Sequence, residues 1–197
     1  MFLATTSLTR IGVEACVDFL EAAAKRLRSV WIPLPQEVCR GEPADLGPLE
    51  KYLEPLVALY HEVGAGWRCY GSVAELRRRE LAAVRLAALV VKARVYGKVD
   101  VEEWDRYFTR GAEKPPRPAL ALGAVAGEDG VVCGTYPPNP IELAHEVWHK
   151  LPRDKKTALA RWVAEYVSAI VESVNLDEAY FKLLRKGWAE AYVNYIS

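Results

Sequence analysis

The sequence predicts a mainly α-helical protein that carries one small β-hairpin. Everything before residue 112 has the apolar spacing of helices. The one β-like part follows, where the turn-rich tetrapeptide 127–130 separates two short runs of small and β-branched residues. Of the 197 residues, 51% are hydrophobic and 26% are charged, which is ordinary for a globular chain and provides enough apolar side chains for a sizeable core.

Four helices are expected in the first part of the chain, over residues 7–28, 47–64, 72–97 and 100–111. Their ends carry recognisable signals, because Ser72 begins a capping-box pattern and Gly97 ends the long third helix. The proline-rich segment 113–118 then breaks the pattern and is the best internal boundary. We therefore expect a helical region over residues 1–112 and a second region over residues 118–197, packed together as one compact unit.

Two of the three histidines stand in one pentapeptide, His145-Glu146-Val147-Trp148-His149, which has the HExxH pattern. On a helix, residues four apart project from one face, so His145 and His149 can offer two imidazole nitrogens to one tetrahedral zinc ion. Glu146 is then placed to take a proton from a metal-bound water. The alternative is a helix that uses both histidines as polar surface residues or as hydrogen-bonding core residues.

A short helix is expected to carry this motif. Asn139 has the properties of an N-cap, Pro140 suits the first helical position, and Glu142 stands three residues after the cap. Pro152 should end the helix at or before Leu151. The histidines are therefore predicted near the C-terminal end of the helix.

A zinc ion that keeps an open position for water needs a third protein ligand. His61 lies in a distant helix, so we look to carboxylates downstream of the motif. Glu190 stands out as the only charged residue of the last eleven, in a run that is apolar on nearly every side. A buried carboxylate is costly there unless it is paired or binds a metal. Glu178 and Glu172 remain the alternatives, although a helix start and a helix flank explain them without a metal.

The pairing of HEVWH with the later run WAEAYVNY resembles the gluzincins, zinc metallopeptidases whose glutamate helix in the aminopeptidase branch commonly reads Trp-x-x-Glu-Gly-Phe-Ala-x-Tyr. The resemblance covers two short motifs, residues 139–151 and 187–196. It implies a zincin-like active-site helix and a glutamate helix, with Glu190 as the third zinc ligand. Tyr192 and Tyr195 are near enough to Glu190 in sequence for one of them to stabilise an oxyanion, although a packed aromatic ring is the more common role.

The predicted hairpin pairs residues 119–126 with residues 131–136, just before the motif. In zinc peptidases of this kind, a strand before the active helix often borders the cleft. An exposed edge there could bind an extended peptide through main-chain hydrogen bonds, with little sequence preference. A plain hairpin that covers the helix core is the alternative.

The sequence thus predicts a zinc-dependent peptidase that acts on a peptide or protein substrate. His145, His149 and Glu190 would hold zinc, and Glu146 would serve as the general base for the attacking water. The alternative is a non-catalytic regulatory or interaction protein, in which the helical N-terminal half acts and the metal site is structural or vestigial.

Other partners and locations are disfavoured. The longest apolar stretch, residues 81–95, is interrupted by three basic residues and is too short to span a bilayer. The net charge is zero, and the basic cluster 77–79 is diluted by neighbouring glutamates, which argues against nucleic-acid binding. No basic and apolar leader precedes the first helix, so a cytoplasmic protein is expected.

The four cysteines are scattered without a CxxC pair, which argues against a second metal site and favours burial as small apolar residues. They are Cys16, Cys39, Cys69 and Cys133. The chain holds one Gln, one Met and three Asn, a composition typical of a thermophile. Intracellular disulfides occur in such organisms.

Overall fold

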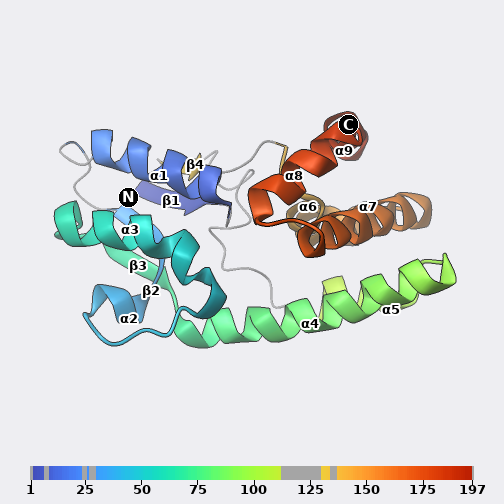
Figure 1. The fold of residues 1–197 in the computed structure, drawn as a ribbon, viewed down its shortest axis with the longest axis horizontal. Coiled ribbons are helices and arrows are strands. Elements are labelled where there is room, and N and C mark those ends of the chain that lie inside the picture. Colours follow the sequence, from blue (N-terminus) through green and yellow to red (C-terminus); the bar gives the residue numbers. More distant parts are fainter. Residues whose placement is uncertain are drawn as a thin grey trace. The chain divides into compact units, whose positions relative to one another are not determined.

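The computed structural model describes residues 2–6, 9–23, 26, 30–111, 130–133 and 137–196. These residues form a mainly α-helical protein with a small β element, as predicted (Figure 1). The contacts divide the chain into two units. Unit 1 comprises Met1–Arg78 and Pro115–Thr135, and unit 2 comprises Arg79–Lys114 and Tyr136–Ser197.

Unit 1 is built on a parallel sheet of four strands. The strands are β1 (Phe2–Thr6), β2 (Val30–Pro35), β3 (Arg68–Gly71) and β4 (Gly130–Cys133), in the order β3-β2-β1-β4. The prediction that everything before residue 112 is helical is therefore wrong for three segments. Each holds only four to six residues, and helical and strand periodicity cannot be told apart over so short an apolar run.

One arm of the predicted hairpin lies in β4. Residues 130–133 pair in parallel with β1, at the other end of the sequence. The other predicted arm, residues 119–126, lies outside the described residues, as do residues 134–136. Parallel pairing needs a long crossover connection, which local sequence signals do not reveal.

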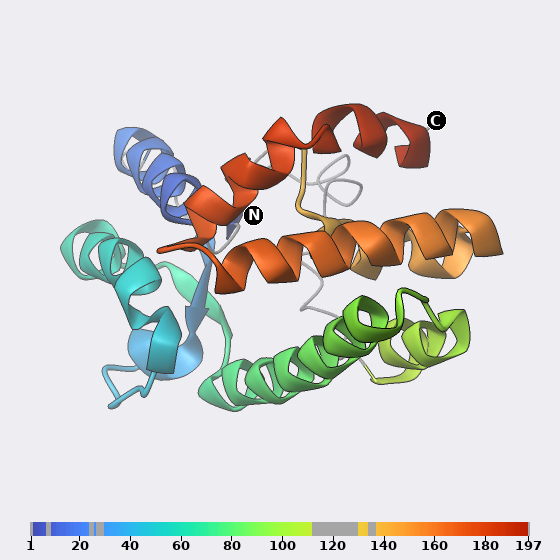
Figure 2. The ribbon, with the colours of Figure 1, turned by 45° about the vertical axis from the view of Figure 1, so that its right-hand side comes forward.

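Helices α1 (Arg10–Ala23) and α3 (Glu50–Val63) lie side by side in unit 1 (Figures 1 and 2). Their apolar faces share a core with alternate residues of β2, because side chains of a strand point in turn to opposite faces of the sheet. This core includes Val13, Leu20, Ile32, Leu34, Leu53 and Leu56. The short helix α2 (Gln36–Cys39) and the 3-10 turn η1 (Gly47–Leu49) complete the connection from β2 to α3.

A disulfide joins Cys39 at the end of α2 to Cys69 in β3. Two of the four cysteines are therefore cross-linked rather than simply buried, whereas Cys16 lies in the core of unit 1. The disulfide closes the chain segment that contains α3, so it restricts the unfolded state of unit 1.

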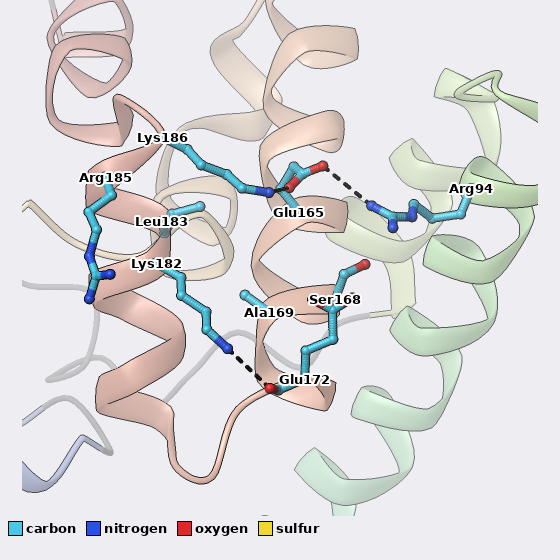
Figure 3. Close-up of a pocket in the computed structure, with 9 residues that line it drawn as sticks. All are labelled: Arg94, Glu165, Ser168, Ala169, Glu172, Lys182, Leu183, Arg185 and Lys186. Carbon is cyan, nitrogen blue, oxygen red and sulfur yellow. Dashed lines mark hydrogen bonds and ion pairs between the residues drawn. The ribbon is translucent and has the colours of Figure 1, made fainter.

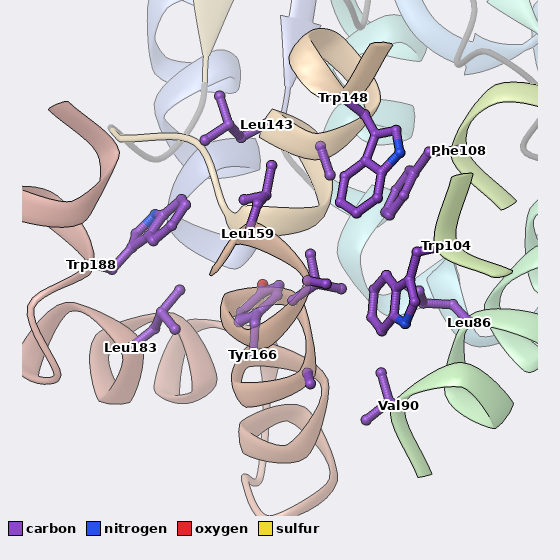
Figure 4. Packing of buried hydrophobic residues seen from close by; sticks show 14 of the residues in the cluster. Leu86, Val90, Trp104, Phe108, Leu143, Trp148, Leu159, Tyr166, Leu183 and Trp188 are labelled. Carbon is purple, nitrogen blue, oxygen red and sulfur yellow. The ribbon is translucent and has the colours of Figure 1, made fainter. Parts of the chain in front are cut away.

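All secondary-structure elements in the described part of unit 2 are helices. Its elements are most of α4 (Val73–Tyr96), α5 (Val101–Asp105), the π-helical η2 (Arg106–Gly111), α6 (Pro140–Val147), the 3-10 turn η5 (Trp148–Lys150), α7 (Arg153–Val171), α8 (Leu176–Arg185) and α9 (Trp188–Ile196). A large aromatic and aliphatic core joins them (Figure 4). Trp104, Trp148 and Trp188 are among its fully buried side chains.

The division of the chain differs from the one we predicted. The segment 113–118 does contain one passage between the units, at Lys114–Pro115. The first 112 residues, however, do not form one region, because Leu86, Val90 and Trp104 pack into the same core as Leu143 and Leu159. Burial of apolar surface, rather than order along the chain, thus sets the boundary after Arg78.

The predicted ends of the internal helices are confirmed where the signal is local. The Ser72 hydroxyl accepts the Glu75 N–H at the start of α4, and Gly97 follows its last residue with a φ of 65°. Asp100 accepts the N–H groups of Glu102 and Glu103 at the start of α5. Among the described residues, no helix is long and apolar enough to span a membrane.

Candidate functional site

The helix that carries the HExxH motif begins as the sequence predicts. The Asn139 side chain accepts the N–H groups of Ile141 and Glu142 at 3.0 and 3.1 Å, and the Glu142 carboxylate accepts the Asn139 N–H at 3.0 Å. This capping box satisfies donors that a helix start leaves open. Burial raises the pKa of Glu142 to about 7, although its hydrogen bonds with Asn139 act in the opposite direction.

The end of this helix alters the spacing on which a metal site depends. α6 ends at Val147, and Trp148–Lys150 form a tighter 3-10 turn before Leu151 leaves the helix. A 3-10 residue advances about 20° further than an α-helical one, so His149 is rotated roughly 40° beyond its place on a continuous α-helix. His149 is exposed, whereas His145 and Glu146 are partly buried.

The buried side of the motif packs against aromatic rings. The His145 ring lies 5.1 Å from the Phe108 ring in an edge-on contact and 6.3 Å from the Tyr107 ring. Trp148 is only 1% exposed, and its ring lies 4.8 Å from Phe108 and 6.3 Å from Trp104. Figure 4 shows Trp148, Phe108 and Trp104 in this cluster. Two positions of the pentapeptide therefore contribute to the core of unit 2.

A polar contact fixes the position of Trp148. Its indole N–H donates to an Asp105 carboxylate oxygen at 2.6 Å, and the Lys156 ammonium donates to the same oxygen at 2.7 Å. Partial burial alone would raise the pKa of Asp105, but the hydrogen bonds from Lys156 and Trp148 outweigh it and lower the pKa. The buried indole N–H is thereby satisfied, as burial requires.

Glu190 is exposed, whereas its apolar neighbours in the sequence predicted that it would be buried. It lies in the first turn of α9, where a carboxylate interacts favourably with the helix dipole. The residues of the same run that face the core are aromatic. Trp188 is fully buried, and its indole N–H donates to the Pro138 carbonyl at 2.8 Å.

The two tyrosines of this run, Tyr192 and Tyr195, pack against Trp188. The rings of Tyr192 and Tyr195 each lie 6.3 Å from the Trp188 ring. Burial raises the pKa of Tyr195 to about 12. Aromatic contacts around Trp188 thus account for the spacing of the WAEAYVNY run without a ligand.

The alternative third ligands also have structural partners. The Glu178 carboxylate accepts the Val174 N–H at 2.9 Å and pairs with Lys182 at 3.1 Å, while Asn175 caps α8. Glu172 is exposed at the C-terminal end of α7. Within the described parts of the chain, no three His, Cys, Asp or Glu side chains are grouped so that they could hold a metal ion. His145, His149 and Glu190 are therefore not grouped as three ligands in the described part of the chain, and the zinc site stays a prediction.

A pocket of about 290 Å³ lies in unit 2 between α4, α7 and α8 (Figure 3). Its charged lining consists of Arg94, Glu165, Glu172, Lys182, Arg185 and Lys186. Glu165 pairs with both Arg94 and Lys186, and the Lys182 ammonium donates to the Glu172 carbonyl at 3.0 Å. These contacts link α4, α7 and the end of α8. Most of the cationic side chains that line the pocket therefore already have a partner within the chain.

The second place of chemical interest is the carboxyl edge of the sheet in unit 1. β1 and β4 are parallel neighbours, and their last residues, Thr6 and Cys133, are register partners. β2 and β3 lie on the other side of β1. The chain therefore leaves β1 toward one side of the sheet and later returns to β4 on the other side. In open parallel sheets, ligands bind at such a switch point, beyond the carboxyl ends of the strands.

Three residues separate the end of β1 from the start of helix α1. Thr9 is 2% exposed, its hydroxyl accepts the Gly12 N–H at 3.1 Å, and its carbonyl accepts the Val13 N–H at 3.0 Å. Arg10, the first helical residue, is exposed and lies 2.6 Å from the Glu14 carboxylate. The start of α1 thus combines the positive end of the helix dipole with a cationic side chain, both of which favour anions.

The sequence reasoning missed this edge because it assigned helix to the whole first part of the chain. A signal was present, since FLATT and VWIPLP are short β-prone runs that each precede a helical segment. No family model matches this chain, and no curated protein or solved structure is similar to it.

Proposed function

We propose that the protein is a non-catalytic regulatory protein that binds an anionic small molecule at the carboxyl edge of the sheet in unit 1. The observation that carries this proposal is the strand order β3-β2-β1-β4, which puts the switch point between β1 and β4. It develops the second function predicted from the sequence, that of a non-catalytic regulatory protein. It assigns the binding site to the sheet instead of to the helices of the N-terminal half.

The chemistry of this edge favours a phosphate or a similar anion. The helix dipole adds partial positive charge at the start of α1. The Arg10 guanidinium, which pairs with Glu14 through Nε, can exchange this partner for a phosphate or carboxylate and give it two parallel hydrogen bonds. Nucleoside phosphates combine such an anion with an apolar base, which suits a crevice at a sheet edge.

A regulatory role is consistent with the path of α4. This helix follows β3 after a single residue, and its residues Val73–Arg78 belong to unit 1 while Arg79–Tyr96 belong to unit 2. In unit 1 the Glu37 carboxylate accepts the Val73 N–H at 3.3 Å, and Arg77 pairs with Asp45 at 3.3 Å. One continuous helix therefore begins in the unit that holds the proposed site and continues into the core of the other.

Binding of ATP, pyrophosphate and uncharged adenosine to the full chain, measured by calorimetry at low salt, tests this proposal. We expect ATP and pyrophosphate to bind, and we expect Arg10→Gln to weaken them about tenfold, the effect of losing one charge-assisted hydrogen bond. Arg26→Gln is the matched control, because Arg26 is exposed beyond the other end of α1. Equal weakening by both variants, or no binding of either anion, would contradict the proposal.

The zinc-dependent peptidase predicted from the sequence is the second candidate. The feature that favours it is HExxH itself, with Glu146 partly exposed beside His145. It requires a third ligand from outside the described residues. Elemental analysis of protein supplied with zinc, for the wild type and for His145→Ala, tests it. One zinc per chain that is lost in the variant would support the peptidase. No bound zinc in the wild type would contradict it.

A further inference from the structure

Helix α4 carries two apolar faces, although a helix on the surface of a unit normally needs one. One face packs into the core of unit 2, through Leu86 and Val90 with Ala82, Leu89 and Ala93 beside them. The other face is exposed. We name it the α4 stripe, and it consists of Leu81, Val84, Ala88, Val91 and Val95. Its four larger side chains are 65%, 68%, 61% and 71% exposed.

The residues of the α4 stripe have the spacing of a coiled-coil seam. They follow one another at intervals of three, four, three and four residues, which is the heptad pattern of alternating a and d positions. Leu81, Ala88 and Val95 occupy the a positions, and Val84 and Val91 occupy the d positions. Isolated apolar side chains on a surface are common, but a contiguous row of this length marks an interaction site.

We propose that the α4 stripe is the contact through which two copies of this chain associate, with the two α4 helices parallel. The partner is a second copy because a heptad seam is complementary to itself under two-fold symmetry. The seam covers only about two heptads and is smaller than a standard stable interface. The structure therefore fits a monomer–dimer equilibrium at micromolar concentration rather than an obligate dimer.

The charges beside the α4 stripe favour the parallel arrangement. In a parallel pair, a g position faces the e position five residues later in the partner, so Glu80 would face Arg85 of the other copy. Ala87 would face Lys92, which adds no repulsion. An antiparallel pair would instead oppose Arg85 to Arg85 and Arg78 to Lys92. Its one attractive pair, Glu80 with Arg94, would compete with the ion pair between Arg94 and Glu165.

The ion pairs within the chain agree with this assignment. Lys92 pairs with Glu103, and Arg94 pairs with Glu165. Glu80 and Arg85, by contrast, are both exposed, and neither forms an ion pair with a side chain that the structure describes. A parallel partner would bring these two opposite charges together.

Analytical ultracentrifugation of the full chain over a hundredfold range of concentration tests the proposal. We expect the wild type to dimerise and Val84→Glu/Val91→Glu to raise the dissociation constant at least tenfold. Both positions are exposed, so the variant should fold, which circular dichroism checks. Val171→Glu/Val174→Glu is the matched control, because these two valines are more exposed and lie outside α4.

A charge exchange tests the orientation of the two helices. Glu80→Arg should weaken the dimer severalfold, and the double variant Glu80→Arg/Arg85→Glu should restore it. Failure of the double variant to restore it would overturn the parallel arrangement. A wild type that stays monomeric at every concentration would overturn the proposal. So would a stripe variant that lowers the melting temperature of a monomer, since the α4 stripe would then pack within its own chain.

Discussion

The Glu142 carboxylate should make the stability of unit 2 fall as the pH rises toward neutrality. It closes the capping box of α6 by accepting the Asn139 N–H. Burial raises its pKa to about 7 from an ordinary value of 4.5. The folded state therefore holds this proton more tightly than the unfolded chain does, and unfolding releases it between these two pH values.

The sign and size of the effect follow from this difference in pKa. Below pH 4.5 the Glu142 carboxyl group is protonated in both the folded and the unfolded state, so it does not lower the free energy of unfolding. Between pH 4.5 and 7 the unfolded state ionises first, so the free energy of unfolding falls, and above pH 7 it levels off. At about 1.4 kcal/mol per pKa unit the loss is at most about 3 kcal/mol. Because Glu142 retains some contact with water, we expect about 1 to 2 kcal/mol.

Urea unfolding at pH 5, 6, 7 and 8 measures this loss, with tryptophan fluorescence as the signal. Four of the six tryptophans belong to unit 2. Glu142→Gln keeps an oxygen that can accept the Asn139 N–H, but its side chain cannot ionise. Between pH 5 and 8, the free energy of unfolding of this variant should therefore rise by about 1 to 2 kcal/mol relative to that of the wild type. Parallel pH profiles for the wild type and Glu142→Gln would refute the reasoning.

The matched control is the corresponding carboxylate of α8. The Val174 N–H and Lys182 lower the pKa of Glu178. Its contribution to stability is therefore complete above pH 4.5 and is lost only as the pH falls further. Glu178→Gln should leave the slope between pH 5 and 8 as in the wild type.

Three further predictions concern the disulfide, the core and the exposed glutamate. Cys39→Ser/Cys69→Ser removes a cross-link between residues 30 apart and should destabilise unit 1 by about 3 to 4 kcal/mol in thermal unfolding; an unchanged melting temperature would contradict this. Trp148→Ala should lower the free energy of unfolding of unit 2 by about 3 to 5 kcal/mol in urea unfolding, as for other buried aromatic residues. A loss under about 1 kcal/mol would show that the ring is not part of the core. Glu190→Ala should change the stability by less than about 1 kcal/mol and leave the metal content unchanged, and a loss of bound zinc would count against our account of α9.

The sequence was informative where structure is determined by neighbouring residues. The capping box of Asn139 and Glu142, and the glycine that ends α4, are each contained within one turn of helix. Such signals act through hydrogen bonds between residues three or four apart. The parallel sheet could not be predicted in this way, because β1 and β4 come from distant parts of the chain.

The surroundings of the candidate zinc-site residues also depend on tertiary packing. The HExxH spacing is suitable for two ligands only if the helix stays α-helical, and the tight turn at Trp148 accompanies tertiary packing against Phe108. The apolar surroundings of Glu190 in sequence also do not bury it. Trp188 and Tyr192 lie four residues apart on the face of α9 that meets the core, and Glu190 lies between them on the exposed side.

Hydrogen exchange of the full chain, with and without saturating ATP, tests the proposed function most directly. We predict slower exchange at the end of β1, at the first turns of α1 and in β4, where the switch point of the sheet lies. Protection confined to α4, α7 and α8, around the charged pocket of unit 2, would contradict the account, as would unchanged exchange throughout the chain.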